Sequence, residues 1–142
     1  MSFAALQYIQ DHVDLIREGD FDSLYKDVGS KEYLIPEITK TLLDAEVDPL
    51  EYLHSIPNRY AFCLTEIKDI VIPPSVRTIR GSAFAECPNL TTAVLPSTIL
   101  AIKNEAFSFS SKLKSINLPD SCLFIGQSAF AGTALKEVVL PK

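Results

Sequence analysis

The sequence predicts an α+β fold, in which a short solenoid of about 3.5 repeats of 22–23 residues is capped by an N-terminal bundle of short helices. Two recurrences predict the solenoid, because a period in the low twenties built on Leu, Ile and Phe is typical of stacked repeats. Strand-like segments that end in proline recur at offsets of 23, 23 and 22, at residues 70–73, 93–96, 116–119 and 138–141. An Ala-Phe pair recurs every 23 residues, at 83–84, 106–107 and 129–130.

Within each repeat, apolar and polar residues alternate as in a strand that buries one face. In the third copy, Ile116 and Leu118 alternate with polar neighbours, so both side chains are expected to point inward. Pro119 then ends the strand, because proline cannot donate to the ladder. The Phe of each Ala-Phe pair is expected to fill the centre of its coil, so that one column forms from Phe62, Phe84, Phe107 and Phe130.

The pattern resembles a known class of repeat. In its third copy it reads Leu113-x-x-Ile116-x-Leu118-Pro119, then Ile125, then Ala129-Phe130. This resembles the BspA-like class of leucine-rich repeats over about residues 56–142, which implies a leucine-rich-repeat solenoid with its strand ladder on the concave face. A helical front before a few such repeats also resembles small proteins of bacteriophages and other compact microbial genomes. That second resemblance implies a phage-type accessory protein that acts on a host protein.

Four short helices are predicted before the repeats. The first spans residues 3–17, because its apolar residues recur at steps of three or four along one face, as a stripe of Phe3, Leu6, Ile9, Val13 and Ile16. The others are shorter and are delimited by capping residues and prolines. The expected starts and stops are Ser2 and Gly19, Asp20 and Gly29, Pro36, and Asp48-Pro49 with Pro57.

These helices are expected to cover the open end of the repeats. Each is near or below the roughly 12–15 residues at which an isolated helix becomes marginally stable, and the end of a repeat stack needs a cap. The pair Ala61-Phe62 lies 22 residues before 83–84, so the repeat pattern begins near Ile56. The chain is therefore divided into an acidic helical cap, residues 1–55, and leucine-rich repeats, residues 56–142, packed on the cap as one unit.

Charge is unevenly shared between the two halves. Residues 1–60 hold five Lys/Arg against twelve Asp/Glu, a net charge of −7, and residues 61–142 hold eight against six, a net charge of +2. The acidic half disfavours nucleic acid as a partner, because phosphate repels it. The same charge leaves open a contact with a basic surface, including the repeats of a second copy, or mimicry of nucleic acid.

Other features bear on location. No apolar run approaches the roughly 18 residues of a membrane span, so no membrane partner is expected. The first ten residues lack the basic and apolar regions of a secretory signal. Three cysteines are an odd number without metal-type spacing, which favours reduced thiols and a cytoplasmic protein.

No catalytic chemistry is predicted. The sequence has no phosphate loop, no paired-carboxylate motif and no metal-ligand cluster, so neither an enzyme nor a cofactor is expected. Cys63 with His54 could suggest a Cys–His pair, but nothing positions a third group or an oxyanion donor. Cys122 aligns with Val76 and Ile99 and is expected to be a small buried side chain. Cys87 falls between an Ala-Phe pair and Leu90, where the resembling family often has Cys, and no reactive or metal-binding role is expected for either.

Two outward-facing sets of residues are candidate partner-binding surfaces, because the fold does not dictate them. The first is a strip of valines on the strand ladder, namely Val71, Val94 and Val139. The second follows each proline, where the first repeat has Arg77-Thr78 but later repeats have apolar residues: Leu100, Leu123 and Phe124. These three would form an exposed apolar patch of the kind that marks interaction surfaces. Alternatively, local twist tucks them into the core, or the register differs by one residue.

The leading interpretation is a non-enzymatic protein–protein interaction module with a protein partner of unknown identity. A repeat stack offers a broad rigid surface, and its outward residues choose the partner. The alternative is a self-assembling structural subunit, such as a homodimer, that pairs through the apolar patch or through the open C-terminal strand edge near Lys142.

Overall fold

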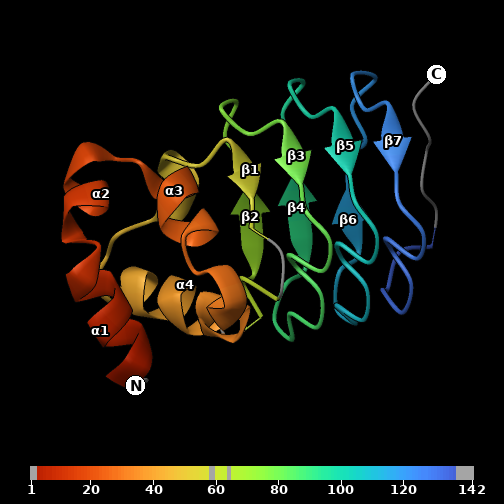
Figure 1. Ribbon diagram of the computed structural model, residues 1–142. Coiled ribbons are helices and arrows are strands. Elements are labelled where there is room, and N and C mark those ends of the chain that lie inside the picture. Colours follow the sequence, from red (N-terminus) through yellow and green to blue (C-terminus); the bar gives the residue numbers. More distant parts are fainter. Residues whose placement is uncertain (1–2, 58–59, 64, 137–142) are drawn as a thin grey trace.

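The computed structural model describes residues 3–57, 60–63 and 65–136, which form helices at one end and a stack of parallel coils at the other (Figure 1). The helices are α1 (Phe3–Asp11), α2 (Val13–Glu18), α3 (Phe21–Lys26) and α4 (Ile35–Asp44), with the 3-10 helices η1 (Gly29–Leu34) and η2 (Pro49–Glu51). The strands are β1 (Ser55–Ile56), β2 (Asp69–Val71), β3 (Thr78–Ile79), β4 (Thr92–Val94), β5 (Ala101–Ile102), β6 (Ser115–Ile116) and β7 (Phe124–Ile125). Together they give the α+β repeat fold that the sequence predicts. We call α1 to η2 the helical cap.

The helix predicted for residues 3–17 is wrong as a single element, because the chain breaks at His12 into α1 and α2. The His12 side chain donates through Nδ1 to the carbonyl oxygen of Tyr8 at 2.7 Å, and the two rings stack with centroids 4.0 Å apart. The predicted apolar stripe also fails at two positions. Phe3 is 80% exposed and Val13 is 38% exposed, whereas Tyr8 is buried.

Most predicted helix boundaries are confirmed, but two predicted ends are wrong: α3 ends at Lys26, before Gly29, and the helix expected to reach Pro57 is the 3-10 helix η2, which ends at Glu51. Gly19 ends α2 in the left-handed conformation, with φ of 73°. The Asp20 carboxylate accepts a hydrogen bond from a backbone N–H of α3 at 3.2 Å, and Asp48 does the same for η2 at 3.0 Å. Pro36 lies in the first turn of α4, as expected. The predicted cap at Ser2 lies outside the described residues.

The strands form two parallel sheets, one three-stranded in the order β2-β4-β6 and one four-stranded in the order β1-β3-β5-β7. The three-stranded sheet is the predicted ladder, and its predicted fourth member, residues 138–141, lies outside the described residues. The four-stranded sheet was not predicted, because strands of two residues are too short to show alternation. Its pairing Ile56↔Ile79 brings Ile56 into the repeated register.

The predicted column of phenylalanines is confirmed inside the coils. Neighbouring rings stack with centroids 4.9, 5.2 and 5.7 Å apart, in the order Phe62, Phe84, Phe107 and Phe130. Cys122 is buried, as its alignment with apolar positions predicts, and Cys87 is buried as well. Burial raises the pKa of the Cys87 thiol to about 12, so this thiol stays protonated at neutral pH.

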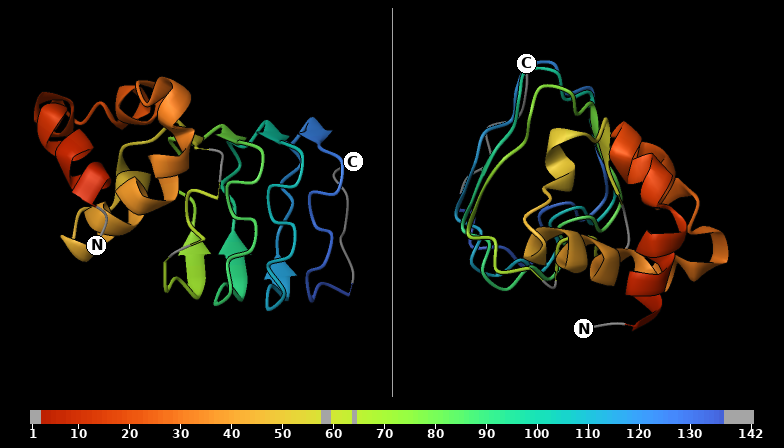
Figure 2. Two further views of the ribbon diagram at one scale, coloured as in Figure 1. Left: turned by 60° about the horizontal axis from the view of Figure 1, so that its bottom comes forward. Right: turned by 90° about the vertical axis from the view of Figure 1, so that its left-hand side faces the viewer.

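The helical cap lies against one end of this core. Viewed along the stack, α4 and the chain around η2 lie across the end of the coils, with α1 to α3 at one side (Figure 2). One continuous cluster of buried apolar residues extends from Ala5 in α1 to Ala129 in the last described coil. The cap therefore shares its core with the repeats.

Candidate partner-binding surfaces

The outer face of the three-stranded sheet carries the predicted valine strip. Val71 and Val94 lie opposite each other in β2 and β4 and are 69% and 51% exposed. The third predicted member, Val139, lies outside the described residues. Beside the valines, the Thr92 hydroxyl donates to the Asp69 carboxylate at 2.6 Å. Asp69 also accepts from the Thr91 hydroxyl at 3.2 Å, so the polar side chains beside the valines are hydrogen-bonded to one another.

Asn117 interrupts the strip in the third coil. Its side-chain oxygen accepts from the Leu95 N–H at 2.7 Å, and its side-chain nitrogen donates to the Leu95 carbonyl at 2.9 Å. The side chain thereby completes the backbone hydrogen bonding of the preceding coil, one residue beyond the end of β6. In the described part of the chain, the valine strip therefore consists of two residues, Val71 and Val94.

The outer face of the four-stranded sheet carries the predicted apolar patch. Leu123 is 84% exposed, Phe124 49% and Leu100 41%, so the alternative in which local twist buries them is wrong. Leu123 lies next to Leu100, because its N–H donates to the Leu100 carbonyl at 2.8 Å. We keep the name apolar patch for these three residues. Whether a partner binds them stays a prediction.

Next to the patch, the strand register builds a column of mostly small side chains. Ser55, Thr78, Ala101 and Phe124 follow one another through β1, β3, β5 and β7. The first three are small, so the face is low over the first three coils, and the Phe124 ring bounds it at the fourth. The sheet therefore carries a row of side chains that crosses the strands from Ser55 to Phe124 of the apolar patch, and we call this row the channel.

Two cations line one side of this channel. Arg80 and Lys103 occupy equivalent positions of successive coils, 23 residues apart, and both side chains are exposed. A hollow of about 440 Å³ is lined by Ser55, Thr78, Arg80, Gly81 and Lys103, and we call it the basic hollow. Among the described residues, no carboxylate lines it.

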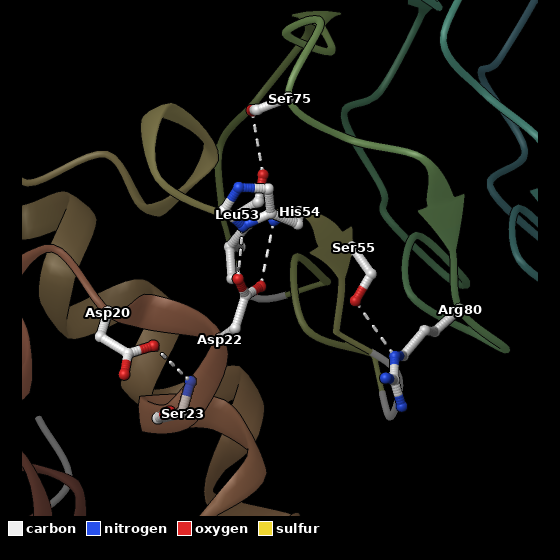
Figure 3. Close-up of polar contacts among 8 residues, drawn as sticks. All are labelled: Asp20, Asp22, Ser23, Leu53, His54, Ser55, Ser75 and Arg80. Atoms are coloured by element: carbon white, nitrogen blue, oxygen red, sulfur yellow. Dashed lines mark hydrogen bonds and ion pairs between the residues drawn. The ribbon is translucent and has the colours of Figure 1, made fainter.

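The contacts of these cations leave their charges available. Arg80 donates through Nε to the Ser55 hydroxyl at 3.3 Å, which turns the guanidinium along the sheet (Figure 3). Lys103 Nζ lies 5.2 Å from the centre of the Phe124 ring, a cation–π contact that joins the basic hollow to the apolar patch. Within the described ranges, neither cation forms an ion pair with a carboxylate.

A second cleft lies between the helical cap and the first coil. Its volume is about 600 Å³, and its lining includes Asp22, Glu32 and His54. Figure 3 shows Asp22 reaching from α3 to the chain before β1, where it accepts from the His54 backbone N–H at 3.0 Å and from His54 Nδ1 at 2.6 Å. His54 thus binds Asp22 in this structure. Burial raises the pKa of the Cys63 thiol, which argues against a reactive Cys–His pair.

Sequence reasoning missed two of these features. Asp22 and His54 are 32 residues apart and follow no motif, so no sequence signal could have joined them. Arg80 and Lys103 could have been found, because they share the 23-residue step that identified the hydrophobic positions.

Among the described residues, no group of three or more His, Cys, Asp or Glu residues is placed to hold a metal ion. No helix in the described ranges is long and apolar enough to cross a membrane.

Comparison with known proteins agrees with the repeat geometry. Residues 49–142 match the BspA type leucine rich repeat region in six copies, which confirms the resemblance seen in the sequence. The chain belongs to the family of BspA-type leucine-rich repeat proteins. The match begins at η2, a few residues before the predicted start of the repeats. No curated protein and no solved structure matched the chain significantly.

Proposed function

We propose that this protein is a non-enzymatic protein–protein interaction module, built as a solenoid of about 3.5 repeats on an acidic helical cap, and that it docks its partner on the four-stranded sheet. The observation that carries the proposal is the exposure of Leu100, Leu123 and Phe124 on one face. Contiguous exposed apolar side chains are costly for an isolated protein and often mark contact surfaces. Leucine-rich repeats supply a rigid, extended scaffold for such contacts.

The apolar patch is a stronger candidate than the valine strip. Valine is favoured in strands for its own sake, so an exposed valine on a sheet has a structural reason. Leu123 and Phe124 stand where the first repeat has Arg77 and Thr78, so the coil folds with polar residues at these positions. Their apolar character is therefore not required by the fold.

The experiment compares two matched double variants in a pull-down from the native cell. We expect Leu123→Lys/Phe124→Lys to lose the dominant partner, and Val71→Lys/Val94→Lys to keep it. Both pairs are exposed, so each variant should keep its free energy of unfolding within about 1 kcal/mol of the parent. Retention of the partner by the first variant, with unchanged folding, would remove the apolar patch from the proposal.

The partner is proposed to be a host protein, in keeping with the resemblance of the helical front to small phage and microbial repeat proteins. This predicts that the dominant protein recovered in the pull-down is encoded by the host genome. Recovery of a protein encoded beside this chain would contradict the host-directed part of the proposal and leave the docking surface in place.

Self-assembly through the same patch is the second candidate, because a patch of leucines and phenylalanine on one copy can meet the same patch on another. Light scattering at two protein concentrations distinguishes the two. A stable dimer that Leu123→Lys/Phe124→Lys converts to a monomer favours self-assembly. A monomer at both concentrations favours a separate partner.

We also propose that residues 1–55 and 56–142 fold as one unit. The shared core and the contact of Arg80 with Ser55, which crosses this division, support it. Calorimetry should then show one cooperative unfolding transition, because the short helices cannot persist without the repeats. Two well-separated transitions would contradict this.

A further inference from the structure

We propose that the segment bound on the four-stranded sheet is an acidic one with an apolar anchor. The anchor contacts the apolar patch, and neighbouring carboxylates contact Arg80 and Lys103 in the basic hollow. This inference rests on the docking function proposed above and adds the chemistry of the partner.

The channel geometry sets where the charges of the partner must lie. Neighbouring strands in a sheet are about 4.8 Å apart, so Lys103 lies one coil from Phe124 and Arg80 lies two coils away, about 10 Å. An extended chain advances about 3.3 Å per residue. A segment that runs across the strands therefore needs its carboxylates about one to three residues from its apolar anchor.

The charges of the channel select carboxylates. Arg80 and Lys103 form no ion pair within the described ranges, and no acidic side chain lines the basic hollow. A guanidinium presents a planar fork of N–H donors that matches a carboxylate. Arg77, exposed at the patch edge and bonded through its carbonyl to the Leu100 N–H at 2.7 Å, adds a third positive charge.

The contact between Lys103 and Phe124 joins the two halves of the site. Because Lys103 Nζ lies 5.2 Å from the ring centre, a ligand side chain that packs on Phe124 places its neighbours beside the ammonium group. A carboxylate there is attracted at short range in a partly dehydrated setting, where charge pairs are stronger than in bulk water.

The surroundings limit the extent of the acidic segment. At the cap end, Arg80 also lines the neighbouring cleft, whose lining includes the carboxylates of Asp22 and Glu32. On the other sheet, Asp69 occupies the outward face and is bonded to threonine hydroxyls. The exposed acids Glu105 and Asp120 form no ion pair in the described ranges and do not line the basic hollow.

The test uses selection from a displayed library of random peptides of about 12 residues on the full-length protein. The enriched peptides should carry an aromatic or aliphatic residue with Asp or Glu about one to three positions away. Binding of the best peptides is then measured by fluorescence polarisation. Raising the NaCl concentration from about 50 mM to about 500 mM should weaken it, because exposed charges are screened.

Three variants separate the contributions. Arg80→Glu/Lys103→Glu should weaken binding by about tenfold or more, since a hydrogen bond to a charged group contributes about 1.5–3 kcal/mol. Lys112→Glu/Lys114→Glu makes the same change in net charge at exposed residues outside the channel, and should change binding by less than about threefold. Arg80→Gln/Lys103→Gln, which removes charge without reversing it, serves if the first variant fails to fold.

The outcomes distinguish this inference from the function on which it rests. Enrichment of neutral or basic peptides, or equal weakening by both Glu variants, would overturn the acidic partner. If Leu123→Lys/Phe124→Lys abolishes binding while the Arg80/Lys103 variants do not, the docking surface stands and the acidic partner falls. If no peptide distinguishes the parent from Leu123→Lys/Phe124→Lys, the docking function itself fails. Self-association abolished by Arg80→Glu/Lys103→Glu would assign the site to a second copy instead.

Discussion

The two sheets of the repeat stack are built alike and differ in what they present outward. Both are parallel and pair residues 23 apart, and both cover the same column of phenylalanine rings. On the outer face of the three-stranded sheet, the polar side chains are already hydrogen-bonded within the sheet. Thr92 donates to Asp69, and the Asn117 side chain accepts from the Leu95 backbone N–H. The outer face of the four-stranded sheet has an apolar patch and two cations without an acidic partner in the described ranges.

The difference separates what the fold requires from what it permits. An inward position must fit its neighbours above and below, so mostly apolar residues return there in successive coils. An outward position meets solvent and can change from coil to coil, as Thr78, Ala101 and Phe124 do in one column. Binding properties are therefore expected in the outward residues, and the four-stranded sheet is where they depart furthest from the first coil.

The largest expected effect tests the shared core. Phe107→Ala should lower the free energy of unfolding by about 3–5 kcal/mol, because it empties the middle of the ring column. Phe109, two residues away, is exposed, so Phe109→Ala should cost less than about 1 kcal/mol. Denaturant titration measures both. A loss below about 1 kcal/mol for Phe107→Ala would show that the column is not the common core.

A smaller effect tests how tightly the four-stranded sheet is packed at its far end. A Cβ at Gly126, directly after β7, would lie 2.3 Å from the backbone nitrogen of Asn104. Gly126→Ala should therefore destabilise the fold by about 1–3 kcal/mol through overpacking. At Gly81 the nearest atom is 3.2 Å away, so Gly81→Ala should cost clearly less. Thermal unfolding of the two variants measures the difference. Equal melting temperatures would contradict the claim that the chain is packed more tightly at Gly126 than at Gly81.

The smallest predicted effect concerns the hydrogen bonds of the three-stranded sheet. Asn117→Ala removes two side-chain bonds to Leu95 and should cost about 1–2 kcal/mol. Asn104→Ala, on the other sheet, removes the bond from the Gln127 N–H at 2.8 Å and should cost about half as much. If urea titration ranks the two variants in the opposite order, the three-stranded sheet does not depend on these side-chain bonds as proposed.

Sequence periodicity was sufficient for the inward half of this fold. The steps between Phe84, Phe107 and Phe130 predict the column, and the glycine and aspartate signals place most helix ends. The four-stranded sheet was not predicted, because strands of two residues are too short to show an alternating pattern. The break at His12 escaped because it depends on a side-chain contact with Tyr8 that spacing does not reveal.

The candidate site was predictable only in part, for a physical reason. Leu123 and Phe124 were predicted because they are apolar at positions where the first repeat has polar residues. The contact of Lys103 with Phe124 joins adjacent coils, and it needs both side-chain direction and strand register. The Asp22–His54 contact joins the helical cap to the first coil and follows no pattern. Departures from the repeat pattern therefore indicated the apolar patch as a candidate surface, and only the fold showed which charged side chains lie beside it.

One measurement tests the central claim most directly, namely that the two faces differ in function. Amide chemical shifts of the labelled protein are followed by NMR while a peptide of about 12 residues, with a Leu-Phe anchor followed by Glu-Asp-Glu, is added. We predict that the shifted amides cluster at residues 77–80, 100–103 and 123–124, and that 69–71 and 92–94 stay unchanged. Shifts centred on the three-stranded sheet, or an absence of shifts on the four-stranded sheet, would contradict the account.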